Sequence, residues 1–247
     1  MPPTLSVVLP TYNEQEGIAT AIDKIRAYFK SRNLTGEILV VDDGSTDETV
    51  ASAAACAPGT PAVRLLPGNR NRGKGEAVRR GMLAARGDFI LFTDADLSTP
   101  MTEFDRFSDL LKKGNPVVIG SRKLDPGRVI IKQPFYRQFM GRIFSWMARC
   151  LLNPEVTDFT CGFKAFRREV ATTLFSPLTL DGWAFDAELL QLAQIRRIPV
   201  MEVPVQWSNR AGSRVRLWRD IPQAAADLVR LLWRRWRGHY RREGPVR

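Results

Sequence analysis

The chain has 247 residues, of which 44% are hydrophobic and 26% charged, and its formal net charge is +11. This size and composition are typical of a globular protein with a substantial core, arranged as one large α/β domain or as one domain with an appendage. The charge is concentrated near the C-terminus, where residues 207–247 hold eleven arginines and three acidic residues, and this predicts a polyanion or an anionic surface as partner.

Histidine and cysteine are scarce, and their scarcity excludes several kinds of chemistry. The single histidine is His239, so Ser-His-Asp and Cys-His mechanisms lack a base and zinc sites built on clustered histidines are excluded. Cys56, Cys150 and Cys161 are odd in number and widely spaced, which fits neither a disulfide framework nor a zinc site and indicates a reducing compartment. Acidic residues, arginines and a metal ion held by carboxylates remain as candidates for the chemistry.

Signals for export or membrane insertion are not expected in this chain. The N-terminal MPPTLSVVLP lacks the basic region and the long apolar core of a signal peptide. No run approaches the 18 or so consecutive apolar residues that a membrane-spanning helix needs. We therefore expect a cytoplasmic protein.

Short apolar runs alternate with helical patterns over the first 120 residues. Two pairs, Asn13 with Glu16 and Ser45 with Glu48, have the spacing of capping boxes and predict helix starts after the first and second strands. A third helix is expected after Pro100. The expected strands are 5–10, 37–43, 62–67, 87–94 and 116–122. This alternation predicts a mainly parallel sheet with helices on both faces.

The second half of the chain has a less regular pattern. An apolar-rich helix is expected over 135–152, a strand over 160–168 and a helix over 182–195. The run 198–207 contains two prolines, which would interrupt a central ladder, and so it predicts an edge strand.

Polar side chains gather where the predicted strands end. Ligands bind at the carboxyl ends of the strands in parallel sheets, so this pattern predicts one site for a nucleotide or another phosphorylated ligand. The residues are Thr11, Tyr12, Asn13, Glu14, Asp42, Asp43, Ser45, Asn71, Gly73, Lys74, Asp94, Asp96 and Arg122.

Asp94 and Asp96 end the fourth strand one residue apart. An isolated Asp-x-Asp is most often a solvated turn or a helix cap. At a strand tip, however, two hard oxygen ligands favour Mg²⁺ or Mn²⁺, with diphosphate oxygens and water filling the remaining positions. A divalent ion there would relieve the repulsion between the acids and neutralise a leaving diphosphate.

The segment GNRNRGKG (68–75) nearly matches a Walker A loop but has Gly75 where that motif needs a hydroxyl. A P-loop NTPase is therefore disfavoured. The alternative is a glycine-containing loop followed by a helix that begins near Lys74 and directs its first N–H groups at an anion.

Residues 216–247 form a basic tail rich in arginine and tryptophan. Asp220 is placed to cap a helix and Pro222 suits its first turn. Two interpretations remain open: a terminal helix docked on the core, and an interfacial helix on a membrane. Nucleic acid is disfavoured because no recognised binding module surrounds the basic residues. The apolar stripe consists of Ile221, Ala225, Leu228, Val229, Leu232, Trp233 and Trp236.

Seven motifs, in order, resemble those of glycosyltransferase family 2, and most closely its polyprenyl-phosphate hexose synthases. The resemblance covers about residues 4–215 and implies a GT-A (Rossmann-like) fold with a mixed, mainly parallel sheet, followed by the amphipathic C-terminal helix. It also implies an inverting transfer of a hexose from a nucleotide sugar to a lipid phosphate. The motifs are PTYNE (10–14), VVDDGSTD (40–47), NRGKGEAVRRGM (71–82), DADLSTP (94–100), GSR (120–122), TCGFKAF (160–166) and WAFDAELL (183–190).

The resemblance also implies roles for single residues. The donor site, with Lys74 included, would consist of Pro10, Tyr12, Glu14, Val41, Asp43, Lys74, Asp94, Ala95 and Asp96. Asp94 and Asp96 would hold Mg²⁺ or Mn²⁺; Ser98 stands where some mannose enzymes have a further glutamine ligand. The arginines that contact phosphates would be Arg122, Arg137, Arg210 and Arg214, of which Arg122 and Arg137 join the two aspartates as catalytic residues.

The resemblance implies UDP-glucose or GDP-mannose as the donor. DLSTP and WAFDAELL resemble the glucose enzymes and favour glucose, and PFYR (134–137) and RAGSR (210–214) resemble the mannose enzymes too, so the sugar stays open. A lipid monophosphate is largely dianionic at neutral pH and needs no strong base to attack the anomeric carbon. Arginines suit its oxygens. A hydroxyl acceptor would instead require a carboxylate base, for which Asp158 and Asp186 are candidates.

Other functions remain open at this point. One keeps the fold and uses a soluble or polysaccharide acceptor, and another is a non-catalytic basic domain on membrane or nucleic acid. A nucleotidyltransferase is disfavoured because no glycine-rich loop with a following Lys or Arg comes after the first strand. Expected partners are a polyprenyl phosphate and a membrane surface, with a membrane-embedded partner or a second copy of the chain also possible.

Overall fold

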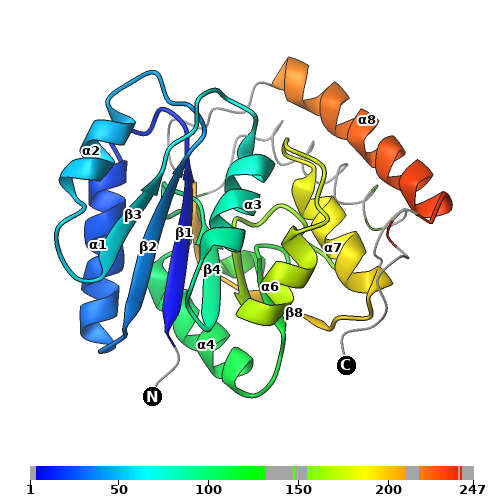
Figure 1. The fold of residues 1–247 in the computed structure, drawn as a ribbon. Helices are drawn as coiled ribbons and strands as arrows, with labels where there is room; N and C mark the ends of the chain where they lie inside the picture. Colours follow the sequence, from blue (N-terminus) through cyan, green and yellow to red (C-terminus); the bar gives the residue numbers. More distant parts are fainter. Residues whose placement is uncertain are drawn as a thin grey trace.

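A seven-stranded mixed sheet, in the order β3-β2-β1-β4-β7-β5-β8, forms the centre of the molecule (Figure 1). The structure is a computed structural model that describes residues 4–131, 147, 149, 155–209, 217–238 and 240. The strands are β1 (Leu5–Thr11), β2 (Gly36–Asp42), β3 (Ala62–Leu66), β4 (Phe89–Thr93), β5 (Val117–Ser121), β7 (Phe163–Arg167) and β8 (Val200–Pro204). A second, two-stranded parallel sheet pairs β6 (Val129–Ile131) with β9 (Trp207–Ser208).

Helices cover both faces of the large sheet, as the apolar strands predict. Val7 and Val8 of β1 are both fully buried, but Val7 belongs to the cluster that includes α1 and α4, and Val8 to the cluster that includes α3, α6 and α7. Each strand therefore contributes to two cores. The helices are α1 (Ile18–Ser31), α2 (Thr49–Ala55), α3 (Lys74–Ala84), α4 (Phe104–Lys112), α6 (Arg168–Phe175), α7 (Phe185–Ile195) and α8 (Leu217–Trp236), with 3-10 turns η1 (Met101–Glu103) and η2 (Pro126–Arg128).

The pairing of the strands confirms a mixed, mainly parallel sheet. The pairs β1–β2, β2–β3 and β1–β4 are parallel, and β5 pairs in parallel with β8. β7 is antiparallel to both of its neighbours, β4 and β5. The start of β7 therefore meets the ends of β4 and β5. β8 is a terminal strand of the sheet, which confirms the edge position expected from its prolines.

Both predicted capping boxes are wrong. α1 begins at Ile18 after Gly17, and α2 begins at Thr49 after Glu48, with no side-chain cap at either start. Instead, the backbone N–H of Asn13 donates to Ser45 Oγ (2.8 Å), and Asn13 Oδ1 accepts from the backbone N–H of Thr46 (2.7 Å). Because β1 and β2 are parallel neighbours, the loops that follow them lie side by side and their polar side chains bond across the gap.

Two expectations concern the helices of the second half. Asp220 lies inside α8, so its predicted role as the cap of that helix is wrong. The helix expected over 135–152 lies outside the described residues except for Met147 and Arg149, which are helical. α8 runs along the outside of the molecule beside α7 (Figure 1).

Candidate active site

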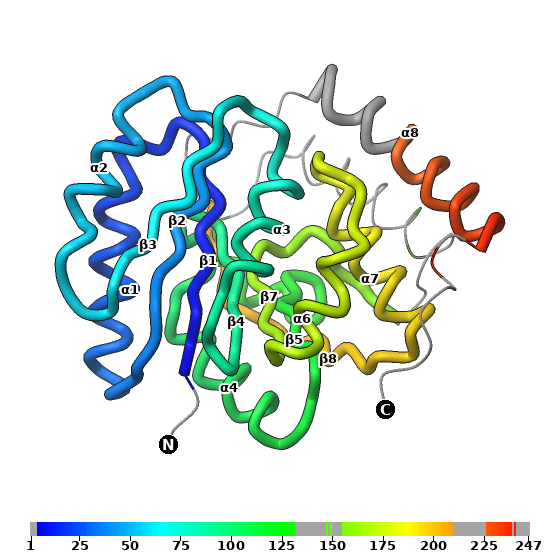
Figure 2. Tube along the Cα trace, in the orientation of Figure 1, coloured from blue at the N-terminus to red at the C-terminus, as the bar shows by residue number. Residues whose placement is uncertain are grey.

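The predicted site residues that the structure describes lie at one end of the sheet. In Figure 2, β1 rises from the N-terminus to its carboxyl end at the top, where the loops after β1 and β2 and the start of α3 are found. Pro10 of β1 is paired in register with Val41 of β2, and Thr11 with Asp42. Tyr12 and Glu14 follow in the loop after β1. The sheet thus brings the expected nucleoside-binding residues together.

Asp94 and Asp96 follow β4 directly, and protein groups already surround both carboxylates. Lys74 Nζ lies 2.5 Å from Asp94 Oδ1. On the other side, a Cβ at position 162 would overlap the Asp94 carboxylate, so a side chain there would require that carboxylate to move. Asp96 accepts hydrogen bonds from the backbone N–H (2.8 Å) and the hydroxyl (2.9 Å) of Ser98. Ala95, which separates the two acids in the sequence, is buried.

Burial and mutual repulsion act on the charges of this acidic pair. Burial, followed by the charge of Asp94, raises the pKa of Asp96. Burial by itself would lower the pKa of Lys74, but the neighbouring carboxylates of Asp94 and Asp186 outweigh it, and the pKa is raised. Lys74 therefore stays protonated and is the cation that balances the pair. Its ammonium also lies 5.1 Å from the centre of the Trp183 ring.

Lys164 and Asp186 form a second ion pair, which is more deeply buried than the pair of Lys74 and Asp94. Lys164 is fully buried in β7 and donates to Asp186 Oδ1 (2.6 Å) and to the carbonyls of Phe159 and Cys161 (both 2.9 Å). Burial raises the pKa of Asp186, although Lys164 opposes the shift. The sequence interpretation missed Lys164. Its signal was a charge inside the apolar run FKAF, which in a central strand requires a buried partner.

Asp43 organises the loop before α3. Its two carboxylate oxygens accept from the backbone N–H groups of Arg72 and Gly73, both at 2.8 Å. Asp42 uses Oδ2 to accept from Gly44 N and Ser45 N (both 3.0 Å). Its Oδ1 is buried and has no hydrogen-bond partner among the described residues. A buried acceptor left unpaired is costly, so Asp42 Oδ1 is a place where a ligand donor would be stabilising. The sequence interpretation placed Asp42 in the site but did not single out this oxygen.

Arg122 follows β5 and is held by Asp158. Its Nε and Nη2 donate to the two oxygens of Asp158, both at 2.8 Å, and Nη2 also donates to Thr160 Oγ1 (2.8 Å). The guanidinium lies 5.5 Å from the centre of the Trp207 ring. Burial would raise the pKa of Asp158, but Arg122 outweighs burial and holds that pKa well below its usual range. Asp158 is therefore the counter-ion of Arg122 and a poor proton acceptor.

The other three predicted phosphate contacts, Arg137, Arg210 and Arg214, lie outside the described residues. Among the described residues, Arg122 is the arginine of that set that the structure places at the carboxyl ends of the strands.

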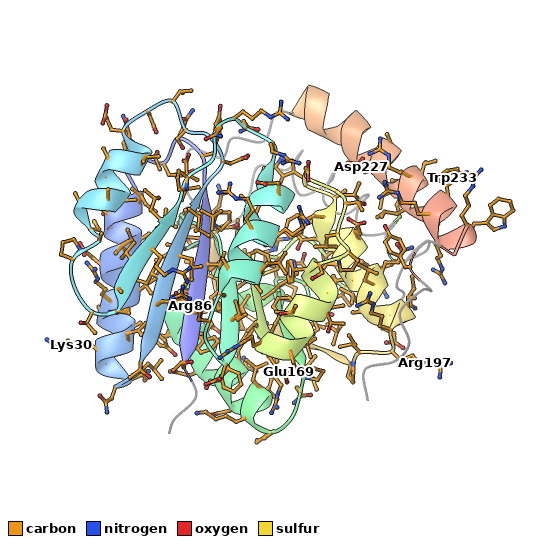
Figure 3. All side chains as sticks on the ribbon, viewed as in Figure 1. Lys30, Arg86, Glu169, Arg197, Asp227 and Trp233 are labelled. Carbon is orange, nitrogen blue, oxygen red and sulfur yellow. The ribbon has the colours of Figure 1, made fainter. Side chains whose placement is uncertain are left out.

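The tail helix α8 docks on the core through one face and exposes another. Leu228 and Leu231 are buried in the cluster that includes α7. Beyond the helix, Tyr240 donates its hydroxyl to Glu188 Oε1 (2.6 Å). Val229, Trp233 and Trp236 are 65%, 50% and 83% exposed. Figure 3 marks Asp227, which is buried, and Trp233 on this helix. Docking on the core is thus observed, and an apolar outer face remains.

A sheet of this topology, with paired aspartates at the tip of β4, defines a GT-A-like glycosyltransferase fold. The model of the family described as Glycosyl transferase family 2 matches residues 6–175. The chain belongs to this family, and the predicted fold class and enzyme class are confirmed.

Curated relatives share most of the chain. It is 37% identical over 245 residues to "Dolichyl-phosphate beta-glucosyltransferase" of Drosophila melanogaster, covering 94% of this chain and 75% of the relative. The human protein of the same name is 34% identical over 97% of this chain and 78% of its own length. The Saccharomyces cerevisiae protein of that name is 33% identical over 91% of this chain and 73% of its own length.

Solved structures confirm the fold. Mannosyl-3-phosphoglycerate synthase from Rubrobacter xylanophilus superposes with a TM-score of 0.70 at 22% identity, covering 99% of this chain and 77% of that one. Glucosyl-3-phosphoglycerate synthase from Mycobacterium tuberculosis, solved with uridine diphosphate, superposes with a TM-score of 0.67 at 26% identity, covering 94% of this chain and 81% of that one.

Proposed function

We propose that the chain transfers glucose from UDP-glucose to the phosphate of a dolichyl-type polyprenyl phosphate. The relatives named as dolichyl-phosphate glucosyltransferases support the acceptor and the sugar. One observation about the site carries the proposal: both carboxylates that would serve as a base, Asp158 and Asp186, are instead ion-paired to Arg122 and Lys164. Such a site suits an acceptor that is already ionised rather than a hydroxyl that must lose a proton.

The donor would lie across the ends of β1, β2 and β4. Its nucleoside would contact Pro10, Tyr12, Glu14, Val41 and Asp43, and Asp42 Oδ1 offers an unpaired acceptor for a base N–H. Its diphosphate would lie near Lys74, Asp94, Ala95 and Asp96. A solved glucosyl-3-phosphoglycerate synthase binds Mn²⁺ together with UDP-glucose, which supports a uridine donor.

The acidic pair fits a divalent cation by its donor atoms. Carboxylate oxygens are the ligands that Mg²⁺ and Mn²⁺ prefer. Among the described residues no group of three or more His, Cys, Asp or Glu could hold a metal by itself, so Asp94 and Asp96 would share the ion with diphosphate oxygens. When bound, the ion neutralises charge on the leaving diphosphate.

The acceptor phosphate would enter on the β5 side of the site. As a dianion it attacks the anomeric carbon directly, and attack from the face opposite the leaving diphosphate inverts that carbon. Arg122 would donate a hydrogen bond to the phosphate and orient it, and Arg137, Arg210 and Arg214 would add positive charge beside it. Arg122 stays charged at every accessible pH because Asp158 holds its pKa above the ordinary value despite burial.

The proposed acceptor lies in a membrane, and the tail helix has features that suit contact with a membrane surface. No helix in the described part of the chain has both the length and the apolar composition to cross a bilayer. The exposed Val229, Trp233 and Trp236 form an apolar face on α8, and the Arg237 guanidinium stacks 3.9 Å from the centre of the Trp233 ring. Aromatic residues beside arginines suit the boundary of an anionic bilayer.

The decisive experiment is a matrix of donors and acceptors. UDP-glucose and GDP-mannose are each tested with a polyprenyl phosphate and with 3-phosphoglycerate, with and without Mn²⁺, and labelled product is partitioned into organic solvent. We expect label in the organic phase with UDP-glucose, polyprenyl phosphate and metal. Transfer to 3-phosphoglycerate alone would contradict the lipid acceptor, and transfer from GDP-mannose alone would contradict the donor.

A further inference from the structure

Glu202 lies in the edge strand β8 and holds the loop that carries Asp158. Its Oε1 accepts from Thr157 Oγ1 (2.7 Å) and from the backbone N–H of Asp158 (2.8 Å). Its Oε2 accepts from the backbone N–H of Thr157 (3.0 Å). One carboxylate thus accepts three hydrogen bonds from two consecutive residues, which lie more than forty positions away in the chain. Hydrogen bonds to an ionised acceptor are stronger and more directional than neutral ones.

The loop in turn fixes Arg122. Asp158 is fully buried and accepts from Nε and Nη2 of Arg122 and from the backbone N–H of the same residue (3.0 Å). With Thr160 as a further acceptor, both N–H groups of Nη2 are used. Nη1 makes no hydrogen bond with any residue that the structure describes, so this nitrogen remains for a ligand oxygen. The orientation of Nη1 therefore depends on where Asp158 stands.

We propose that Glu202 is a positioning residue for the acceptor phosphate, acting through Thr157 and Asp158 to orient Nη1 of Arg122. This inference rests on the proposed function, because it assigns Arg122 to the acceptor side. The register supports the connection, since Glu202 pairs with Ile119 and both strands end at the same edge, with Arg122 directly after β5. A shift of Thr157 and Asp158 would rotate the guanidinium without removing its charge.

Glu202 is the charged residue in an otherwise apolar strand. β8 is otherwise composed of Val, Met and Pro residues, and Glu202 is only partly exposed in it. The charge is therefore placed where it loses solvation, and its three hydrogen bonds to the loop offset that loss. The loop is thereby tied to the sheet at a point adjacent to Arg122.

The test compares Glu202→Ala and the isosteric Glu202→Gln with the wild-type chain. Farnesyl phosphate serves as the short polyprenyl phosphate in steady-state kinetics and in calorimetric titration. We expect Glu202→Ala to raise the KM and the dissociation constant of farnesyl phosphate by about tenfold, the factor for one hydrogen bond to a charged group. Affinity for UDP should stay within about twofold, which also reports that the variant is folded. Glu202→Gln, which keeps one acceptor oxygen, should restore part of the loss.

A double-mutant cycle separates positioning from a general structural effect. On an Arg122→Met background, Glu202→Ala should have little further effect on farnesyl phosphate, because the group that it orients is gone. Glu169→Gln is the matched control, since Glu169 is exposed and lies at the opposite end of the sheet (Figure 3).

The outcomes distinguish this inference from the proposed function. Equal losses on the two backgrounds, or unchanged farnesyl phosphate affinity in both Glu202 variants, overturn the positioning role while leaving the acceptor in place. A wild-type chain that binds UDP but not farnesyl phosphate contradicts the acceptor itself and overturns this inference with it.

Discussion

Lys74 and Asp94 form an ion pair with 2.5 Å between Nζ and Oδ1, so an ammonium from the start of α3 occupies one of the two carboxylates proposed to bind the metal. A divalent cation that reaches Asp94 must compete with this internal cation. The pair places a positive charge beside two acids that stand one residue apart at a strand tip.

Removing the internal cation should therefore strengthen metal binding in the absence of nucleotide. We expect Lys74→Met to increase the affinity for Mn²⁺ alone by about fivefold, the equivalent of an ion pair worth about 1 kcal/mol, as measured by electron paramagnetic resonance of free Mn²⁺. In the presence of UDP the gain should shrink, because Lys74 would otherwise contact the diphosphate. Lys30→Met, on exposed surface away from the site (Figure 3), is the control. Unchanged or weaker Mn²⁺ binding would contradict the competition.

Asp96 should be required for turnover rather than for folding. Asp96→Asn keeps an acceptor for the Ser98 N–H but removes the charge. We expect a loss in kcat of about 100-fold or more, the scale of one removed electrostatic contact at a reacting group, with the melting temperature preserved. Wild-type turnover in Asp96→Asn would exclude the acidic pair from the reaction.

A side chain at position 162 should displace the Asp94 carboxylate. Because a Cβ at this position would overlap the Asp94 carboxylate, we expect Gly162→Ala to displace that carboxylate and weaken Mn²⁺ binding in the presence of UDP. Gly127→Ala, at an exposed turn, is the matched change. The prediction fails if both variants bind Mn²⁺ as the wild type does.

The ion pair of Asp158 with Arg122 should appear in the pH dependence of stability. The pKa of Asp158 is held below its ordinary value of 3.8, since the charge and hydrogen bonds of Arg122 outweigh burial. The folded state thus binds this proton less readily than the unfolded state, so the contribution is complete above about pH 4 and is lost as the pH falls below it.

Asp158→Asn tests this linkage by urea unfolding between acid and neutral pH. We expect the variant to be about 3 kcal/mol less stable at neutral pH, because it leaves the partly buried Arg122 without its counter-ion. The free energy of unfolding should also decline less steeply in acid than in the wild type. Parallel pH profiles for the two chains would show that Asp158 titrates alike in the folded and unfolded states.

The two faces of α8 should respond differently to substitution. Leu231 is fully buried, so Leu231→Ala should cost about 2–5 kcal/mol of stability. Trp233→Ala with Trp236→Ala should leave stability nearly unchanged but reduce sedimentation with phosphatidylserine vesicles. Vesicle binding that is indifferent to the tryptophans would place the membrane contact elsewhere.

Much of the fold was predictable because its signals are local. Five apolar runs predicted β1 to β5, and the prolines around Val200 predicted an edge strand. The insertion of β7 between β4 and β5 was not predictable, because pairing partners more than forty residues apart leave no periodic trace. Capping boxes failed for a related reason, since Asn13 and Ser45 bond to each other's loops rather than to their own helices.

The sequence predicted which residues form the site better than it predicted how those residues pair. Asp94, Asp96, Lys74 and Arg122 were found from their positions at strand ends, but which charged groups pair with each other was not. Asp158 lies 36 residues from Arg122, and Lys74 lies 20 residues from Asp94. Such pairs form only when the strands assemble into the sheet. The sequence could therefore name the charged groups without showing which ones neutralise each other.

The reversed direction of β7 has a consequence for how specificity can diverge in this enzyme. The residues just before that strand contact the proposed donor side through Gly162, against Asp94, and the proposed acceptor side through Asp158 and Thr160, against Arg122. We therefore expect a substitution in this stretch to alter the binding of both substrates. Changes in acceptor specificity are accordingly expected in the surrounding loops, and the residues before β7 are expected to keep the two reactants aligned.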